Sequence, residues 1–251
     1  VKVVNCNTPP TAICKPVVAE TTTTCDAMVD AIKFNNESIS NTGGALSYSV
    51  FPAGPYPVGE TLVKLTVTDL SNNKSSTCTT TITVNDVTSP VISVTDVVAV
   101  NDAGVCSATV PLEEPETSDN CGIATVSHDQ PDTTFPVGET IVTWTVTDIH
   151  GNIKTATQKV TVNDAEDPVV TIIDLVAENE PGTCSATVTL TPPAAADKCG
   201  IATIAHDQMD ATFPVGETMV TWTVTDVNEN IETATQKVTV TDTESPEVTV
   251  T

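Results

Sequence analysis

Apolar and polar residues alternate with a period of two along several short segments of this chain. Within Val142-Thr-Trp-Thr-Val146, the alternation places Val142, Trp144 and Val146 on one face of a predicted strand. The following Asp148-Ile-His-Gly-Asn152 is typical of a hairpin turn, and residues 155–162 are expected to form the returning strand. Such segments are rich in Val, Thr and Ile, and no segment of useful length has a helical period. The pattern predicts an all-β fold.

One such stretch occurs three times. Phe135-Pro-Val-Gly-Glu-Thr-Ile-Val-Thr-Trp-Thr-Val-Thr-Asp148 recurs 78 residues later, beginning at Phe213. A looser copy begins at Tyr56, with Leu65 in place of the tryptophan. Copies at one period indicate copies of one folding unit. About seven short strands in each unit predict tandem immunoglobulin-like antiparallel β-sandwiches, three in all.

The linkers between the repeats share a pattern that sets their boundaries. In each linker a strand ends at an Asp and a proline follows four residues later, where sheet pairing must stop. Residues 1–8 are interpreted as the end of a preceding repeat or linker, 9–88 as the first repeat, 89–166 as the second, 167–244 as the third and 245–251 as the start of a following one. We therefore expect an excerpt from a longer secreted protein, joined by short linkers into a semi-rigid rod.

Composition narrows the classes of function. The formal charge of -24, with 33 acidic and 9 basic residues, argues against nucleic acid and anionic membranes as partners. No apolar run is long enough to span a bilayer, so no membrane insertion is predicted. The three histidines are interpreted as inert surface residues, and no set of nucleophile, base and orienting group recurs. We expect no enzyme and no catalytic residues.

The repeated motifs resemble a known family. Phe-Pro-Val-Gly-Glu-Thr, Trp-Thr-Val-Thr-Asp, Gly-Asn and Val-Thr-Val-Asn-Asp resemble the HYR (hyalin repeat) domain, in particular the tandem modules of long surface adhesins from gliding and other Bacteroidota. The resemblance covers the second and third repeats; the first fits less closely, because Leu65 replaces the tryptophan and the Asp-Asn-Cys loop is missing. It implies an immunoglobulin-like, extracellular, non-catalytic domain that serves adhesion.

Eight cysteines without a Cys-x-x-Cys pair predict disulfides and a secreted or cell-surface location. The second and third repeats each carry two cysteines fifteen residues apart. The simplest pairing lies within each repeat, as Cys106–Cys121 and Cys184–Cys199, each contributing about 3 kcal/mol on the chain-entropy view.

The first repeat and its linker hold Cys6, Cys14, Cys25 and Cys78, for which three connectivities are possible. The positions of Cys14 and Cys78 lose their cysteines together in the other repeats, and many HYR domains tie these two positions. We expect Cys14–Cys78, which leaves Cys6–Cys25.

Acidic and amide residues gather in the segments that an immunoglobulin-like sandwich brings to the end where its N-terminal linker enters. Calcium takes six to eight oxygen ligands from such groups, so Ca²⁺ is a candidate cofactor at both junctions. Turn capping and plain solubility explain the same residues without an ion, and both interpretations stay open. The candidate ligands are Asp86, Asp119, Asn120, Asp148 and Asn152 for the second repeat, and Asp164, Glu166, Asp167, Asp197, Asp226 and Asn230 for the third.

The sequence favours a structural stalk of a secreted or surface-anchored adhesin, whose partners are the neighbouring repeats of the same chain. The alternative is a binding module for an extracellular glycan or protein centred on the divergent first repeat. An accessory domain of a secreted enzyme is the third interpretation, and no residue of the chain supports hydrolysis.

Overall fold

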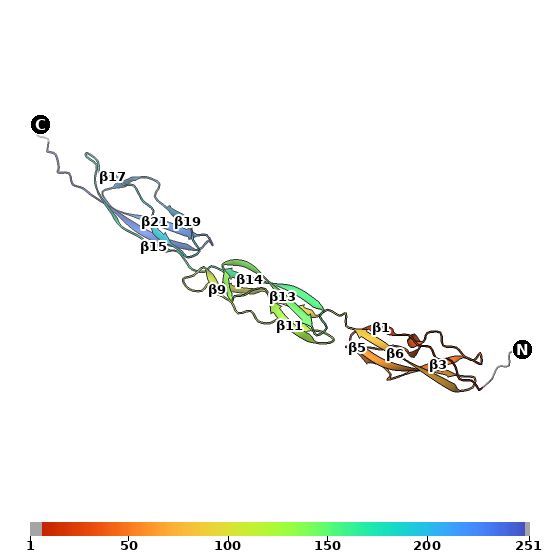
Figure 1. Ribbon diagram of the computed structural model, residues 1–251. Helices are drawn as coiled ribbons and strands as arrows, with labels where there is room; N and C mark the ends of the chain where they lie inside the picture. Colours follow the sequence, from red (N-terminus) through yellow and green to blue (C-terminus); the bar gives the residue numbers. More distant parts are fainter. Residues whose placement is uncertain (1–6, 249–251) are drawn as a thin grey trace. The chain divides into compact units, whose positions relative to one another are not determined.

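The computed structural model describes residues 7–248, whose regular secondary structure is almost entirely β-strand (Figure 1). Within that range the one helical element is the four-residue 3-10 helix η1 (Ala31–Phe34). The predicted class of tandem immunoglobulin-like β-sandwiches is confirmed. The chain divides into two compact units: one holds the residues up to Val94 with Glu114–Asp129 and Thr143–Thr157, and the other holds Thr95–Glu113, Gln130–Val142 and the residues from Gln158 onward.

Each repeat contains one four-stranded sheet. Its two long central strands are joined by the hairpin that the alternating pattern predicts. In the first repeat the order is β1 (Val17–Glu20), β6 (Lys74–Asn85), β5 (Gly59–Asp69) and β3 (Leu46–Phe51). In the second it is β11 (Ile123–His128), β13 (Gly138–Asp148), β14 (Ile153–Asn163) and β8 (Val97–Val100). In the third it is β16 (Leu175–Glu178), β22 (Ile231–Thr241), β21 (Gly216–Asp226) and β19 (Ile201–His206).

One edge of each sheet departs from antiparallel pairing. Strands β1, β8 and β16 run parallel to the last strand of their repeat, with Val17 opposite Ile82 in the first repeat. These strands are distant in sequence from their partners, so no hairpin imposes the antiparallel direction on them.

Short two-stranded pairs complete the repeats. They are β2 (Asp26–Ala27) with β4 (Tyr56–Pro57), β7 (Val91–Ser93) with β10 (Glu116–Ser118), β9 (Ser107–Thr109) with β12 (Thr134–Pro136), β15 (Val169–Thr171) with β18 (Ala194–Ala196), and β17 (Ser185–Thr187) with β20 (Thr212–Pro214).

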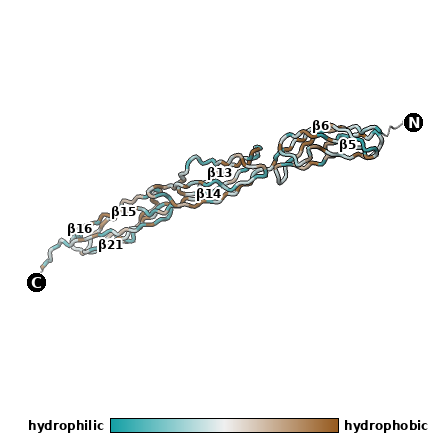
Figure 2. The backbone as a smooth tube through the Cα atoms, turned by 90° about the horizontal axis from the view of Figure 1, so that it is seen from below, coloured by the Kyte–Doolittle hydropathy of each residue, from teal (hydrophilic) through white to brown (hydrophobic). Residues whose placement is uncertain are grey.

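The repeated motif supplies the core. Val142, Trp144 and Val146 are almost fully buried, as the alternation predicts, and Leu65 is fully buried at the tryptophan's position in the first repeat. Figure 2 shows hydrophobic and hydrophilic residues alternating along these strands. The leading aromatic residue of each copy, such as Phe213, is also buried.

The glycine of the motif is needed for the backbone. Gly216 has a φ of 116° and Gly138 a φ of 114°, in the region that side chains rarely adopt. In the third repeat, the short β20 ends just before Gly216 and the long β21 begins at it. The glycine thus allows neighbouring strands of the chain to belong to two different sheets.

Trp222, the tryptophan of the third repeat, belongs to a polar pairing inside the core. The indole Nε1 of Trp222 donates to Oε1 of buried Gln236 at 3.0 Å, and Nε2 of Gln236 donates to the carbonyl of Ile173 at 2.7 Å. The His206 ring packs edge-on against Trp222 at 4.8 Å. The indole is a core residue whose polar atom is satisfied. Within the described residues, no helix is long and apolar enough to cross a membrane.

Candidate functional site

Of the four predicted disulfides, one is confirmed and three are wrong. Cys14 is bonded to Cys78 on β6, with their Cα atoms 6.1 Å apart, so the predicted tie between the start and the last strand of the first repeat is confirmed. Cys25 is bonded to Cys121, and Cys106 to Cys199. The Cα atoms in these two bonds are 4.7 and 4.9 Å apart, an ordinary separation for a disulfide.

The predicted pairs Cys106–Cys121 and Cys184–Cys199 are therefore wrong. The predicted partner of Cys25 is wrong as well, and that partner, Cys6, lies outside the described residues. Cys184 is a free, exposed thiol. Both inter-repeat bonds follow one rule: the cysteine at the position that Cys25 and Cys106 share between repeats is bonded to the second cysteine of the next repeat.

The physical reason is that the two cysteines of a repeat belong to different linkers. Cys106 follows a loop in which Asn101 Oδ1 accepts from the Ala165 amide at 3.0 Å, on the linker that leaves the second repeat. Cys121 lies in a loop beside Asp86, on the linker that enters that repeat. A spacing of fifteen residues carries no information on which end of a repeat each cysteine occupies.

A clue in the sequence could have revealed the offset pairing. Cys25 keeps its cysteine although Thr42 replaces the second cysteine of the same repeat. Cys25 then lacks the partner that Cys121 would be for Cys106, whereas a shift of one repeat gives partners to both Cys25 and Cys106.

The second cysteine of each pair sits in a loop held by an aspartate. Asp119 Oδ1 accepts from the amides of Cys121 and Gly122 at 2.8 and 3.2 Å. Asp197 does the same for Cys199 and Gly200 at 2.7 and 3.0 Å. This Asp-x-Cys-Gly loop therefore presents its cysteine in one fixed way in both repeats.

The first cysteine follows a loop that holds the outgoing linker. Gly104, at a φ of 74°, donates its amide to both carboxylate oxygens of Glu166, at 2.8 and 3.0 Å. Asn101 Nδ2 meanwhile donates to the carbonyl of Val105 at 3.0 Å. Together with the amide of Ala165 on Asn101, these bonds fasten the linker to the loop that carries Cys106.

At the junction of the first and second repeats, a buried carboxylate is fully partnered. The Asp86 side chain has no exposed surface; its Oδ1 accepts from Thr21 Oγ1 at 2.8 Å and from the Thr88 amide at 3.2 Å. His150 Nδ1 lies 3.1 Å from Oδ2. Burial raises the pKa of Asp86, but these hydrogen bonds outweigh it and hold the pKa below its ordinary value.

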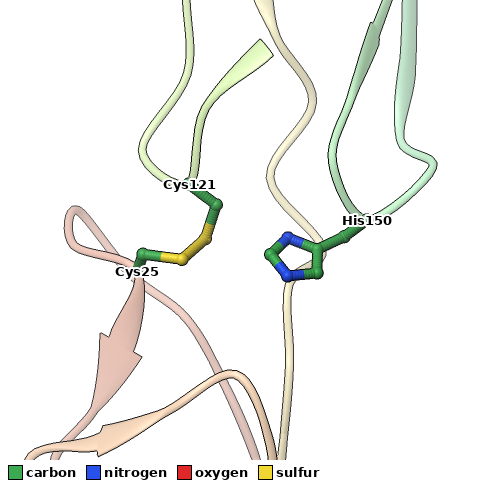
Figure 3. A group of neighbouring side chains, drawn as sticks. All are labelled: Cys25, Cys121 and His150. Atoms are coloured by element: carbon green, nitrogen blue, oxygen red, sulfur yellow. A yellow bond between two sulfur atoms is a disulfide. The ribbon is translucent and has the colours of Figure 1, made fainter. Parts of the chain in front are cut away.

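Sequence reasoning missed His150, which had been assigned no role. Its ring comes from the β13–β14 turn and lies beside the Cys25–Cys121 disulfide, as Figure 3 shows. The neighbouring Asp148 fixes that turn, because its Oδ1 accepts from the amides of His150 and Asn152 at 2.8 and 2.9 Å. A histidine beside a buried carboxylate supplies a positive charge whenever it is protonated.

The junction of the second and third repeats has no histidine at this place in the turn. Asn228 stands where the preceding junction has His150, and its amide donates to Asp226 Oδ1 at 2.8 Å. Asp164 Oδ1 accepts from the Glu166 amide at 3.2 Å, while Oδ2 is buried without a partner among the described residues. Burial raises the pKa of Asp164, and the negative charge of Asp197 and other neighbouring carboxylates raises it further.

Most of the predicted calcium ligands gather at the two junctions. Ligand atoms of Asp86 and Asp148 lie within 4.8 Å of one another and of His150, and those of Asp86 and Asp119 lie equally close, as do those of Asp164 and Asp197.

The amide residues already donate hydrogen bonds to protein groups. Asn152 and Asn230 each donate Nδ2 to the Asp four residues earlier at 2.7 Å. Asn120 Nδ2 donates to the Thr24 carbonyl at 3.3 Å, while its Oδ1 is buried without a partner among the described residues. Asp167 is exposed and lines a surface cavity together with Glu166, Asp197 and Lys198.

At the first repeat, hydroxyl groups replace the acidic cluster. Asp69 Oδ2 accepts from Ser40 Oγ and Thr42 Oγ1, both at 2.6 Å, and Oδ1 accepts from Ser71 Oγ at 2.6 Å. The hydrogen bonds from Ser40, Ser71 and Thr42 hold the pKa of Asp69 far below its ordinary value. A single carboxylate with three hydroxyl donors needs no cation.

Comparison with known proteins identifies the family. The HYR domain matches residues 85–162 and 163–240, which is more than half of the chain. The chain belongs to the HYR domain family. It is 39% identical over 207 residues to hyalin of Lytechinus variegatus, covering 76% of this chain and 38% of that protein. It is 36% identical over 232 residues to hyalin of Strongylocentrotus purpuratus, covering 84% of this chain and 19% of that protein.

The chain thus spans well under half of either hyalin. Among solved structures it resembles Drosophila N-cadherin EC1-4, with a TM-score of 0.36 and 11% identity, over 92% of this chain and 75% of that one. The predicted HYR family is confirmed for the second and third repeats. The relatives are animal proteins, so they give no support to the predicted likeness to Bacteroidota gliding adhesins.

Proposed function

We propose that this chain is an extracellular structural array of the adhesion type, in which disulfides between successive HYR repeats stiffen a stalk. The observation that carries the proposal is the offset pairing of Cys25 with Cys121 and of Cys106 with Cys199. A disulfide across a linker restricts bending there far more than a bond inside one repeat would. Three disulfides also favour an oxidising, extracellular location.

The linker hydrogen bonds act in the same direction. Glu166 on Gly104 and Ala165 on Asn101 fasten one side of the linker, while the Cys106–Cys199 bond joins the flanking repeats. Two attachments at separate points remove rotations that a single one would leave free. This is the physical basis of the stalk.

One peptide bond allows a direct test on the unmodified chain. Asp167-Pro168 is the one Asp-Pro sequence present, and Asp-Pro bonds are selectively cleaved in mild acid. Acid also keeps thiols protonated and so prevents disulfide exchange. Under the offset pairing, the two halves stay joined on a non-reducing gel and separate after reduction. Separation without a reductant would exclude the proposed stalk.

We further propose that the junction of the second and third repeats holds Ca²⁺. Support comes from Asp164, whose buried Oδ2 has no partner in the described range and faces the charge of Asp197 and Asp226. A hard cation with carboxylate ligands would satisfy that oxygen. At the other junction His150 already lies on Asp86, so we expect weaker calcium binding there. Calorimetric titration with CaCl₂ tests this, and no heat of binding would exclude the ion.

A second candidate function rests on the first repeat. Phe51 and Met28 are large apolar side chains that are 78% and 76% exposed, on the copy that diverges most from the motif. Such side chains suit the centre of a contact with a protein or glycan ring. This candidate function predicts that Phe51→Ser in the full chain abolishes capture on a glycan array or by matrix proteins. Equal capture of the wild-type chain and the variant would exclude the binding function.

A further inference from the structure

Cys184 is the one free cysteine among residues 7–248, and it is exposed. It precedes β17, the position that Cys106 holds before β9 in the second repeat. Cys25 precedes β2 in the same way in the first repeat. Both of these equivalents are half-buried, and both are bonded to a cysteine of the next repeat.

The surroundings of Cys184 reproduce those of the bonded Cys106. Asn179 Nδ2 donates to the carbonyl of Thr183 at 2.9 Å, and Oδ1 accepts from the Thr243 amide at 3.0 Å. Gly182, at a φ of 73°, donates its amide to Glu244 Oε1 at 2.8 Å. The linker that follows the third repeat is therefore fastened to the Cys184 loop as the preceding linker is fastened to the Cys106 loop.

Two bonded cysteines at this position, Cys25 and Cys106, thus show what such a cysteine binds. In each, the partner is the cysteine of a loop on the next repeat. Where that loop is Asp-x-Cys-Gly, the aspartate orders it through the cysteine and glycine amides, as Asp197 does for Cys199 and Gly200. No other described cysteine is available to Cys184, because Cys199 is bonded to Cys106.

We infer that Cys184 is an attachment site for a further HYR repeat, whose Asp-x-Cys-Gly cysteine it takes as disulfide partner. The inference rests on the proposed stalk. Two thiols lose two electrons and two protons in forming the bond. A small-molecule disulfide such as oxidised glutathione accepts them and leaves as two thiols, through a mixed disulfide on one of the cysteines.

The test extends the full chain by one repeat with the natural linker. Residues 1–245 are followed by a copy of residues 168–251, which places a proline after Ser245 as at the preceding linker. The protein is refolded with reduced and oxidised glutathione, blocked with a maleimide and mapped by mass spectrometry without reduction. The expected result is a peptide pair joining Cys184 to the appended copy of Cys199, with the appended copy of Cys184 carrying the maleimide.

The matched control changes only the appended copy of Cys199 to serine. Cys184 should then carry the maleimide in full, as it should in the unextended chain. The inference is overturned if Cys184 stays reactive in the extended chain while the appended cysteines bond to each other. It is also overturned if the unextended chain becomes a disulfide-linked dimer through Cys184.

Failure here is distinguishable from failure of the stalk. Acid cleavage at Asp167-Pro168 reports on Cys106–Cys199 alone and does not involve Cys184. Fragments that stay joined, together with an unbonded Cys184 in the extended chain, would reject the attachment site and retain the stalk. Fragments that separate would reject both.

Discussion

Cys106 is bonded to Cys199, 93 residues along the chain, and not to Cys121, its nearest neighbour in sequence among the cysteines of its own repeat. Cys199, the second cysteine of the third repeat, therefore forms the covalent link to the second repeat. It also means that Cys199 is bonded while Cys184 is free, whereas a bond between these two cysteines would have made them equally important for stability.

Serine variants of those two cysteines should therefore differ. Cys199→Ser opens a long loop and should lower the free energy of unfolding by about 2–4 kcal/mol. Cys184→Ser removes an exposed free thiol and should change it by less than about 0.5 kcal/mol. Urea unfolding followed by circular dichroism measures both, and equal losses would indicate the pairing within one repeat.

The buried tryptophan gives a second prediction. Trp222→Ala should cost about 3–5 kcal/mol in the third repeat, because it leaves a cavity and unpairs the Gln236 amide. Trp222→Leu should cost less, since Leu65 fills the same position in the first repeat. The exposed Met209→Ala is the control and should leave the urea midpoint unchanged. A Leu variant as unstable as the Ala variant would contradict the equivalence with Leu65.

The two linker aspartates should respond to neutralisation with opposite signs. The lowered pKa of Asp86 means that its ionised form stabilises the fold above its ordinary pKa, a contribution lost as pH falls through the folded value. Asp86→Asn should therefore lower the melting temperature at pH 7. The raised pKa of Asp164 means that ionisation is unfavourable in the fold, and acidification through that pKa relieves it. Asp164→Asn should raise the melting temperature in EDTA.

Calcium provides the control for this pair. Adding CaCl₂ should raise the melting temperature of the wild-type chain and of Asp86→Asn, and should have little effect on Asp164→Asn. A calcium shift of the same size in all three proteins would remove Asp164 from the ion site. Melting of Asp164→Asn below the wild type in EDTA would contradict the opposite signs.

The sequence was a good guide wherever the determining contacts are local. Alternation around Trp144 identified the core face, and the hairpin at Asp148 followed from its turn residues, because both depend on neighbours in the chain. The tie between Cys14 and Cys78 was also accessible, since the two positions change together between repeats.

Contacts between residues on opposite sides of a linker could not be predicted from the sequence. The partners of Cys106 and Cys121 depend on which end of a repeat each loop occupies, and spacing does not encode that. The position of His150 on Asp86 has the same origin, because the 64 residues between them close only in the folded junction. The asymmetry between the junctions therefore emerged from the structure.

The offset disulfides also determine how far the oxidised chain can be stretched once every strand has been pulled apart. A covalent path from residue 7 to residue 248 runs to Cys25, crosses to Cys121, returns to Cys106 and crosses to Cys199. It follows only about 82 residue steps, roughly 280 Å at full extension, against roughly 820 Å for the reduced chain. Bonds within each repeat would have shortened it far less. Under tension, the segment between Cys106 and Cys121 therefore runs opposite to the direction of the chain. Most of the first and second repeats form closed loops off this path, and these loops cannot lengthen the molecule.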